Sequence, residues 1–134
     1  MSLRGLLGVV SCAAIAACAA ATPATPAASP LAGTRWKGVV DPSTDARIIP
    51  WLEFAPGRLS GFSGCNLLSG TWREEGGEIR LGALAATKRG CVGPASDLER
   101  RVLAAVSDRA RVTREGAKLV FSGPAGERFE FVAQ

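Results

Sequence analysis

The sequence predicts a mainly β fold, a small antiparallel barrel-like or strongly curved sheet domain with one α-helix. Short apolar segments recur along the chain and are separated by turn sequences such as Asp41-Pro42 and Gly76-Gly77. One segment, residues 96–107, has its apolar residues at helical spacing instead. With 134 residues, 47% of them hydrophobic, the chain has room for one domain with one core.

The expected strands are joined by short turns, as in an antiparallel barrel. Pro50 is expected to mark a sheet edge or a bulge, because proline cannot donate a hydrogen bond to a neighbouring strand. Near the C-terminus, Phe129 and Phe131 alternate with Arg128 and Glu130, the period of a half-buried strand. The predicted strands are residues 34–40, 48–54, 58–65, 67–72, 79–81, 111–114, 118–121 and 128–132.

The predicted helix begins with a capping box. Ser96 is expected to be the N-cap, and Glu99 stands three residues further on. One face is apolar and should pack over an open end or edge of the sheet, while the opposite face should point to solvent. The apolar face comprises Leu98, Val102, Ala105 and Val106, with Leu103 at its edge, and the outward face comprises Glu99, Arg100 and Arg101.

Residues 1–17 are predicted to be a lipoprotein signal peptide. Arg4 precedes an apolar stretch that is shorter than the roughly 20 residues needed to span a bilayer. The stretch ends in Ile15-Ala16-Ala17-Cys18, which resembles a bacterial lipobox, so Cys18 is expected to be lipidated. Lipidation at Cys12 would leave a very short apolar core, and ordinary secretory cleavage would release a soluble protein instead.

Residues 18–30 are predicted to be a Pro/Ala-rich tether after the lipidated Cys18, followed by a single domain over residues 31–134. A polyproline II tether of this length would reach about 30–40 Å, at about 3.1 Å per residue. Ala19 and Ala20 follow Cys18 where aspartate would signal inner-membrane retention. In a Gram-negative organism we therefore expect a lipid anchor in the outer membrane, with the domain facing the periplasm.

The cysteines predict one disulfide. Of four cysteines, Cys12 would leave with the signal peptide and Cys18 would be acylated, which leaves Cys65 and Cys91. In an oxidising envelope these two are expected to form a disulfide, and the alternative is a pair of buried free thiols. Two thiolates without any histidine cannot form a tetrahedral zinc site, so we expect no metal and no cofactor.

Three short motifs follow one another along the chain. The first is Gly33-Thr34-Arg35-Trp36, the second is Gly64-Cys65-Asn66-Leu67-Leu68-Ser69-Gly70, and the third is Thr87-Lys88-Arg89-Gly90-Cys91. Together they resemble the META domain (DUF306) of the HslJ-type bacterial lipoproteins, over residues 31–132. The resemblance implies a small β-barrel-like exported domain, an association with envelope stress or heat shock, and no established catalysis.

The residues of the second and third motifs are expected to be structural rather than ligand-binding. Gly64 and Gly70 permit close backbone approach or a positive φ, as at the bends of a barrel. Asn66 can hydrogen-bond neighbouring backbone groups. The family motif interpreted in this way comprises Gly64, Cys65, Asn66, Ser69, Gly70, Thr87 and Cys91.

The composition argues against an enzyme. Without histidine there is no Ser-His-Asp triad and no Cys-His pair, and without tyrosine there is no phenolic acid or base. Glu53 is the carboxylate most worth inspecting for burial, although an outward orientation is favoured. A thiol–disulfide enzyme would need Cys65 and Cys91, whose wide spacing is unlike Cys-x-x-Cys. No catalytic residue is therefore predicted.

The charge distribution indicates no nucleic-acid partner. The formal net charge is +4, and acidic residues interrupt the basic ones. The densest basic stretch either faces acidic lipid or phosphate or, as favoured, is a solvated surface. It contains Arg100, Arg101, Arg109, Arg111 and Arg114.

These features favour a monomeric, non-enzymatic envelope lipoprotein that binds an envelope protein or supports the envelope under stress. The second hypothesis is a barrel that holds a small ligand in its interior. The two hypotheses differ in whether the aromatic side chains fill the interior or leave a pocket. These side chains are Trp36, Trp51, Phe54, Phe62, Trp72, Phe121, Phe129 and Phe131.

Overall fold

The structure, a computed structural model, describes Ala21 and residues 31–134. The predicted signal peptide and Cys18 lie outside these residues. The described elements are β1 (Thr34–Gly38), a 3-10 turn (Ala46–Ile48), β2 (Trp51–Ala55), β3 (Arg58–Phe62), β4 (Leu67–Glu75), β5 (Glu78–Leu81), β6 (Ala85–Ala86), α1 (Pro94–Ala105), β7 (Arg111–Glu115), β8 (Lys118–Ser122) and β9 (Arg128–Ala133). None of the helices among them is both long and apolar enough to cross a membrane.

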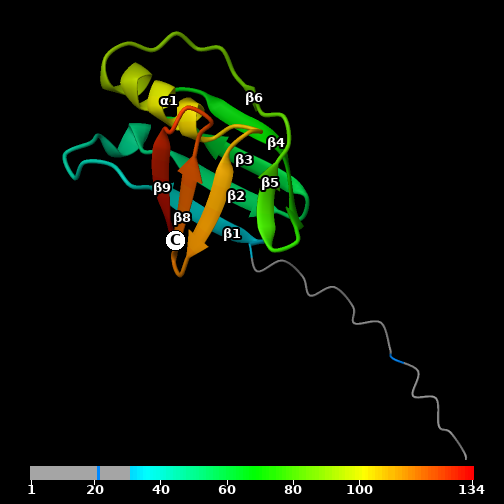
Figure 1. The fold of residues 1–134 in the computed structure, drawn as a ribbon. Coiled ribbons are helices and arrows are strands. Elements are labelled where there is room, and N and C mark those ends of the chain that lie inside the picture. Colours follow the sequence, from blue (N-terminus) through cyan, green and yellow to red (C-terminus); the bar gives the residue numbers. More distant parts are fainter. Residues whose placement is uncertain (1–20, 22–30) are drawn as a thin grey trace, which may run out of the picture.

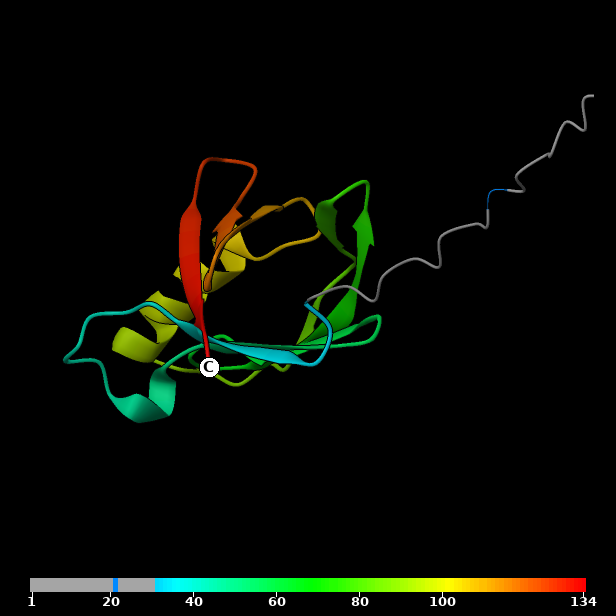
Figure 2. The same ribbon diagram turned by 90° about the horizontal axis from the view of Figure 1, so that it is seen from below.

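The strands form a closed antiparallel barrel, which confirms the predicted fold class (Figures 1 and 2). The order around the ring is β1-β2-β3-β4-β5-β7-β8-β9, and β9 pairs with β1 to close it. The short strand β6 pairs with the first half of β4, beyond the end of β5. Closure pairs the strand edges that an open sheet would expose.

Several strands differ from the predictions: β1 ends at Gly38, β2 begins only at Trp51, β4 extends to Glu75, and β6 was not predicted. Pro50 does not mark a sheet edge or a bulge, because it immediately precedes β2, an inner strand paired with both β1 and β3. Its carbonyl oxygen accepts a hydrogen bond from the Gly38 N–H at 2.7 Å. Proline can do this because it lacks only the backbone N–H and keeps its carbonyl acceptor. Strand β3 ends at Phe62 rather than Cys65, because the next four residues form a turn.

The interior of the barrel is filled by the chain's own aromatic side chains. The ring of Phe54 meets that of Trp72 edge-on at 5.3 Å, and Phe131 contacts both Phe121 and Phe129 at 5.4 and 5.1 Å. These rings and Trp36 are buried in one apolar cluster. Trp51 and Phe62 are half-buried and do not belong to this cluster, so six of the eight aromatic residues fill the core.

Helix α1 lies over one end of the barrel, the upper end in Figure 1, where it packs against β9. Leu98, Val102 and Ala105 form its buried face, as predicted, and Val106 is buried just beyond its end. The prediction of a capping box at Ser96 and Glu99 is wrong. The helix begins at Pro94, with Gly93 as its N-cap at φ 61°, and no side chain caps it. Glu99 does not point to solvent, because its carboxylate is held by residues of the barrel.

The joints between neighbouring strands are unequal. Strands β3 and β4 are in register from Arg58↔Thr71 to Phe62↔Leu67. Strands β5 and β7 are in register only at Ile79↔Val112. We call this second joint the seam.

Candidate functional site: a buried polar clamp and two surface grooves

The second sequence motif forms a tight turn at the end of the barrel that α1 covers. Three hydrogen bonds join Ser63 and Asn66, and two of them measure 2.9 Å. One runs from the Ser63 N–H to the Asn66 carbonyl, and the other from the Asn66 N–H to the Ser63 hydroxyl oxygen. Both residues are buried, although both are polar. Buried polar groups in proteins are normally paired, and here the partners come from two distant parts of the chain.

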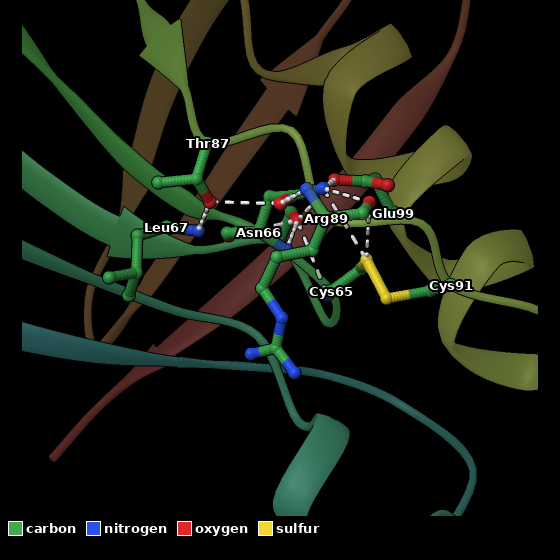
Figure 3. Close-up of a disulfide and its surroundings, with 8 residues drawn as sticks. Cys65, Asn66, Leu67, Thr87, Arg89, Cys91 and Glu99 are labelled. Carbon is green, nitrogen blue, oxygen red and sulfur yellow. Dashed lines mark hydrogen bonds between the residues drawn. A yellow bond between two sulfur atoms is a disulfide. The ribbon is translucent and has the colours of Figure 1, made fainter.

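Asn66 holds the loop that follows β6. Its Oδ1 accepts hydrogen bonds from the Thr87 hydroxyl at 2.8 Å and from the Arg89 N–H at 2.6 Å, and its Nδ2 donates to the Arg89 carbonyl at 3.2 Å (Figure 3). The Thr87 hydroxyl oxygen in turn accepts the Leu67 N–H at 3.0 Å. Both the oxygen and the nitrogen of the Asn66 side-chain amide are therefore hydrogen-bonded within the chain.

Glu99 brings α1 into the same network. Its Oε1 accepts hydrogen bonds from Asn66 Nδ2 at 2.8 Å and from the Ser63 hydroxyl at 3.0 Å. Hydrogen bonds to an ionised acceptor are stronger than neutral ones. We call Ser63, Asn66, Thr87 and Glu99 the polar clamp. The sequence pattern does not reveal this role of Glu99, because a Glu three positions after Ser96 also fits a capping box on the outward face of the helix.

The disulfide lies directly beside the polar clamp. Cys65 and Cys91 are bonded, with a Cα–Cα distance of 6.1 Å and a sequence separation of 26 residues. The bond joins the turn after β3 to the loop before α1 (Figure 3). The predicted disulfide is thus present, and two connections, one covalent and one polar, fasten the same loop.

Two motif glycines lie where a side chain would collide with its neighbours. Gly64 has φ 104°, and a Cβ there would lie 3.1 Å from the Ile48 carbonyl oxygen. A Cβ at Gly70 would lie 2.6 Å from Leu84 Cδ2. Ser69, in contrast, lies apart from the polar clamp on the exposed face of β4.

The described residues show no arrangement of reactive groups. They contain no cluster of cysteine, aspartate or glutamate that could hold a metal ion. The largest carboxyl pKa shift is at Asp45, where hydrogen bonds from the Arg47 side chain and backbone lower the pKa to about 2. Asp45 is exposed, so it is not poised as a buried acid or base. Glu53 is exposed as well and lies 3.6 Å from Arg35.

The first surface groove lies on the outer wall of the barrel, over β2, β3, β4 and β6. It has a volume of about 520 Å³. Leu67 is 56% exposed there, and Arg35 stacks over Trp51 at 4.3 Å from the ring centre. We call it the outer-wall groove, and its lining residues are Trp51, Ser60, Gly61, Leu67, Leu68, Ser69, Ala85, Ala86 and Thr87.

The second surface groove follows the seam and also measures about 520 Å³. Its charged lining residues are Arg80, Arg109, Arg111, Arg114, Glu74 and Glu78, and Leu31 also lines it. We call it the arginine groove. Arg100 and Arg101, which the sequence grouped with these arginines, belong to α1 instead.

The fold and the polar clamp define a small closed β-barrel covered by one helix and locked by one disulfide. The chain belongs to the META domain family, which matches residues 29–134. The second and third motifs of the sequence therefore lie together in space, around Asn66 and the disulfide.

Three solved structures have a similar fold. One is an NMR structure of a protein from Burkholderia xenovorans, with 23% identity and a TM-score of 0.60 over 85% of this chain and 97% of that one. Another NMR structure has 24% identity and a TM-score of 0.61 over 76% and 90%. A crystal structure of a DUF4847 family protein from Bacteroides vulgatus has 15% identity and a TM-score of 0.50 over 77% and 94%. Comparison with curated proteins gives no match.

Proposed function

We propose that the protein is a non-enzymatic binding module of the bacterial cell envelope, anchored to the outer membrane through Cys18, whose outer-wall groove binds an envelope protein. The observation that carries the proposal is the location of the available apolar surface. The barrel interior is occupied by side chains such as Trp36 and Phe131, whereas Trp51 and Leu67 lie in an open groove on the wall. A ligand inside the barrel would have to displace the core.

The chemistry of the outer-wall groove favours a protein partner. Tryptophan and arginine are enriched among the residues that dominate binding energy at protein interfaces, and here Arg35 and Trp51 are already stacked. Leu67 adds an exposed aliphatic side chain beside them. Strand β6 pairs on one side with β4 and is the last strand in the order of the described sheet. An extended segment of a partner could add to its other side.

Site-specific photocrosslinking in intact cells tests the partner. A photoreactive residue at Leu67 should give a crosslinked adduct with one envelope protein, and Leu67→Asp should abolish complex formation without unfolding the domain. The matched control is Leu103, which is also a partly exposed leucine but lies on α1. Equal adducts from both positions, or no adduct from Leu67, would contradict the proposal.

Fatty-acid labelling tests the anchor separately. Cys18→Ser should lose the label and leave the outer-membrane fraction, whereas Cys12→Ser should behave as the wild type. A labelled Cys18→Ser protein in the outer membrane would show that the lipobox assignment is wrong. A role under envelope stress would appear as a growth defect of the Cys18→Ser strain on heating or on envelope damage.

A further inference from the structure

The arginine groove has a surplus of positive charge along the seam. Ile79 and Val112 are the register pair that joins β5 to β7, and extending this antiparallel register by one residue sets Arg80 opposite Arg111. Like charges directly opposite each other weaken strand pairing. Arg80 also stands opposite Arg73 across β4 and β5, so like charges face it from the well-paired side as well.

Within the described residues, two of these arginines have neither an acidic partner nor an aromatic ring to stack on. Arg80 is paired with Glu78 at 2.6 Å, and Arg114 lies over the Trp36 ring at 5.5 Å. Within residues 31–134, no carboxylate oxygen lies within the 4.0 Å of an ion pair from Arg109 or Arg111. Both are exposed and both line the groove.

The position of Leu31 indicates which surface the arginine groove would meet. Leu31 is buried and lines this groove, and it is the first residue of the described domain. If Cys18 is acylated as proposed, the anchor is joined to the domain at a residue that lines the arginine groove.

We propose that the arginine groove binds the phosphate groups of anionic membrane lipids and docks the barrel on the membrane that holds its anchor. The guanidinium group can bind phosphate oxygens in a bidentate manner and is always charged. Anionic lipid surfaces attract basic residues that lie close to them. The inference uses the proposed anchor to place the membrane, but the binding itself depends on Arg109 and Arg111 and is measurable without the lipid.

A vesicle-binding assay tests the proposal. The protein used is residues 18–134 with the substitution Cys18→Ser, so it carries no lipid but retains every strand and helix described above. This protein should bind vesicles that contain anionic phosphatidylglycerol and should not bind pure phosphatidylcholine. Binding should weaken as salt is added, because salt screens exposed charges. Arg109→Gln/Arg111→Gln should weaken binding about 25-fold, since each basic residue near such a surface contributes about fivefold.

The matched control is Arg47→Gln/Lys88→Gln, which removes the same charge at the end of the barrel that α1 covers. It should alter binding by about twofold or less, because exposed charges beyond about 10 Å are largely screened. Equal losses in both double variants, or no preference for anionic vesicles, would overturn the proposal.

An arm with inorganic phosphate separates a lipid from a soluble phosphate ligand. Inorganic phosphate should displace the protein from anionic vesicles no more than sodium chloride of the same ionic strength does. If inorganic phosphate shifts the NMR signals of Arg109 and Arg111 while anionic vesicles bind nothing, the membrane proposal is overturned in favour of a soluble anion. Leu67→Asp, which tests the outer-wall groove, should bind vesicles like the wild type, so the two proposals can fail independently.

Discussion

The polar clamp and the seam are two ways of joining distant parts of one barrel, and they differ in almost every physical respect. The polar clamp, together with the disulfide beside it, connects the turn after β3, the loop after β6, and α1. The seam has one register pair and is lined by arginines. The stability that the disulfide and the polar clamp provide allows weak strand pairing at the seam. Binding residues often cost stability, and here the arginines lie at the weakly paired joint.

Removal of the disulfide should have the largest effect on stability. The chain-entropy model for a loop of 26 residues gives about 3.5 kcal/mol, so Cys65→Ala/Cys91→Ala should lower the free energy of unfolding by about that amount. Urea unfolding measures the change, and reduction of the wild type should reproduce it. A loss below about 1 kcal/mol would mean that the polar clamp holds the loop by itself.

Asn66→Ala should have the second largest effect, about 2–3 kcal/mol in the free energy of unfolding. The substitution leaves the Arg89 N–H without its acceptor and removes one of the two hydrogen bonds to Glu99 Oε1, in a partly buried site. Glu99→Gln keeps an acceptor at the same place and should cost less than Glu99→Ala. If the two Glu99 variants are equally stable, the bond between α1 and the turn contributes nothing.

Arg111→Thr should have a small effect of the opposite sign. Relief of the like-charge pair across the seam and the β propensity of threonine should raise the free energy of unfolding by about 0.5 kcal/mol. Backbone amides of β5 and β7 should exchange with solvent faster than those of β3 and β4 in the wild type, and this difference should narrow in the variant. A destabilised variant would show that Arg111 supports the seam instead of weakening it.

Arg47→Gln should have the smallest effect and sets the scale for an exposed ion pair. Arg47 and Asp45 are 2.6 Å apart but exposed. The pKa of Asp45, lowered to about 2 from 3.8, should rise towards 3.8 in the variant, and NMR titration of the carboxyl group measures it. A lowered pKa stabilises the folded state above pH 3.8, and this contribution is lost as the pH falls from 3.8 to 2. At neutral pH the free energy of unfolding should therefore fall only slightly, because both groups are exposed to solvent.

Local sequence patterns accounted for most of the fold. Alternation and turn residues located the strands, because a half-buried strand must repeat its apolar residues every two positions. The register pairs Phe121↔Phe129 and Leu119↔Phe131 bear out the expected C-terminal meander. The helix start at residue 96 was wrong, because Ser96 and Glu99 satisfy a local capping rule that a tertiary contact overrides.

Only part of the candidate site could be predicted from the sequence. The motifs identified Cys65, Asn66, Thr87 and Cys91, since their residue types and order are local information. That Glu99 completes the polar clamp depends on where α1 docks, and the sequence carries no local signal for an interaction between residues 33 positions apart. Trp51 and Phe62 were assigned with the core aromatics, but strand register turns them outward.

The sequence by itself determined the strand periodicity, the lack of histidine and tyrosine chemistry, and the pair of cysteines available for a disulfide. Only the tertiary structure decided which joints of the barrel are strong and which are weak. Closure of the ring sets the register of every strand at once, and at the seam it places Arg80 and Arg111 in the lining of one groove. The position of the arginine groove beside Leu31 is likewise a product of closure, because residues far apart along the chain meet there.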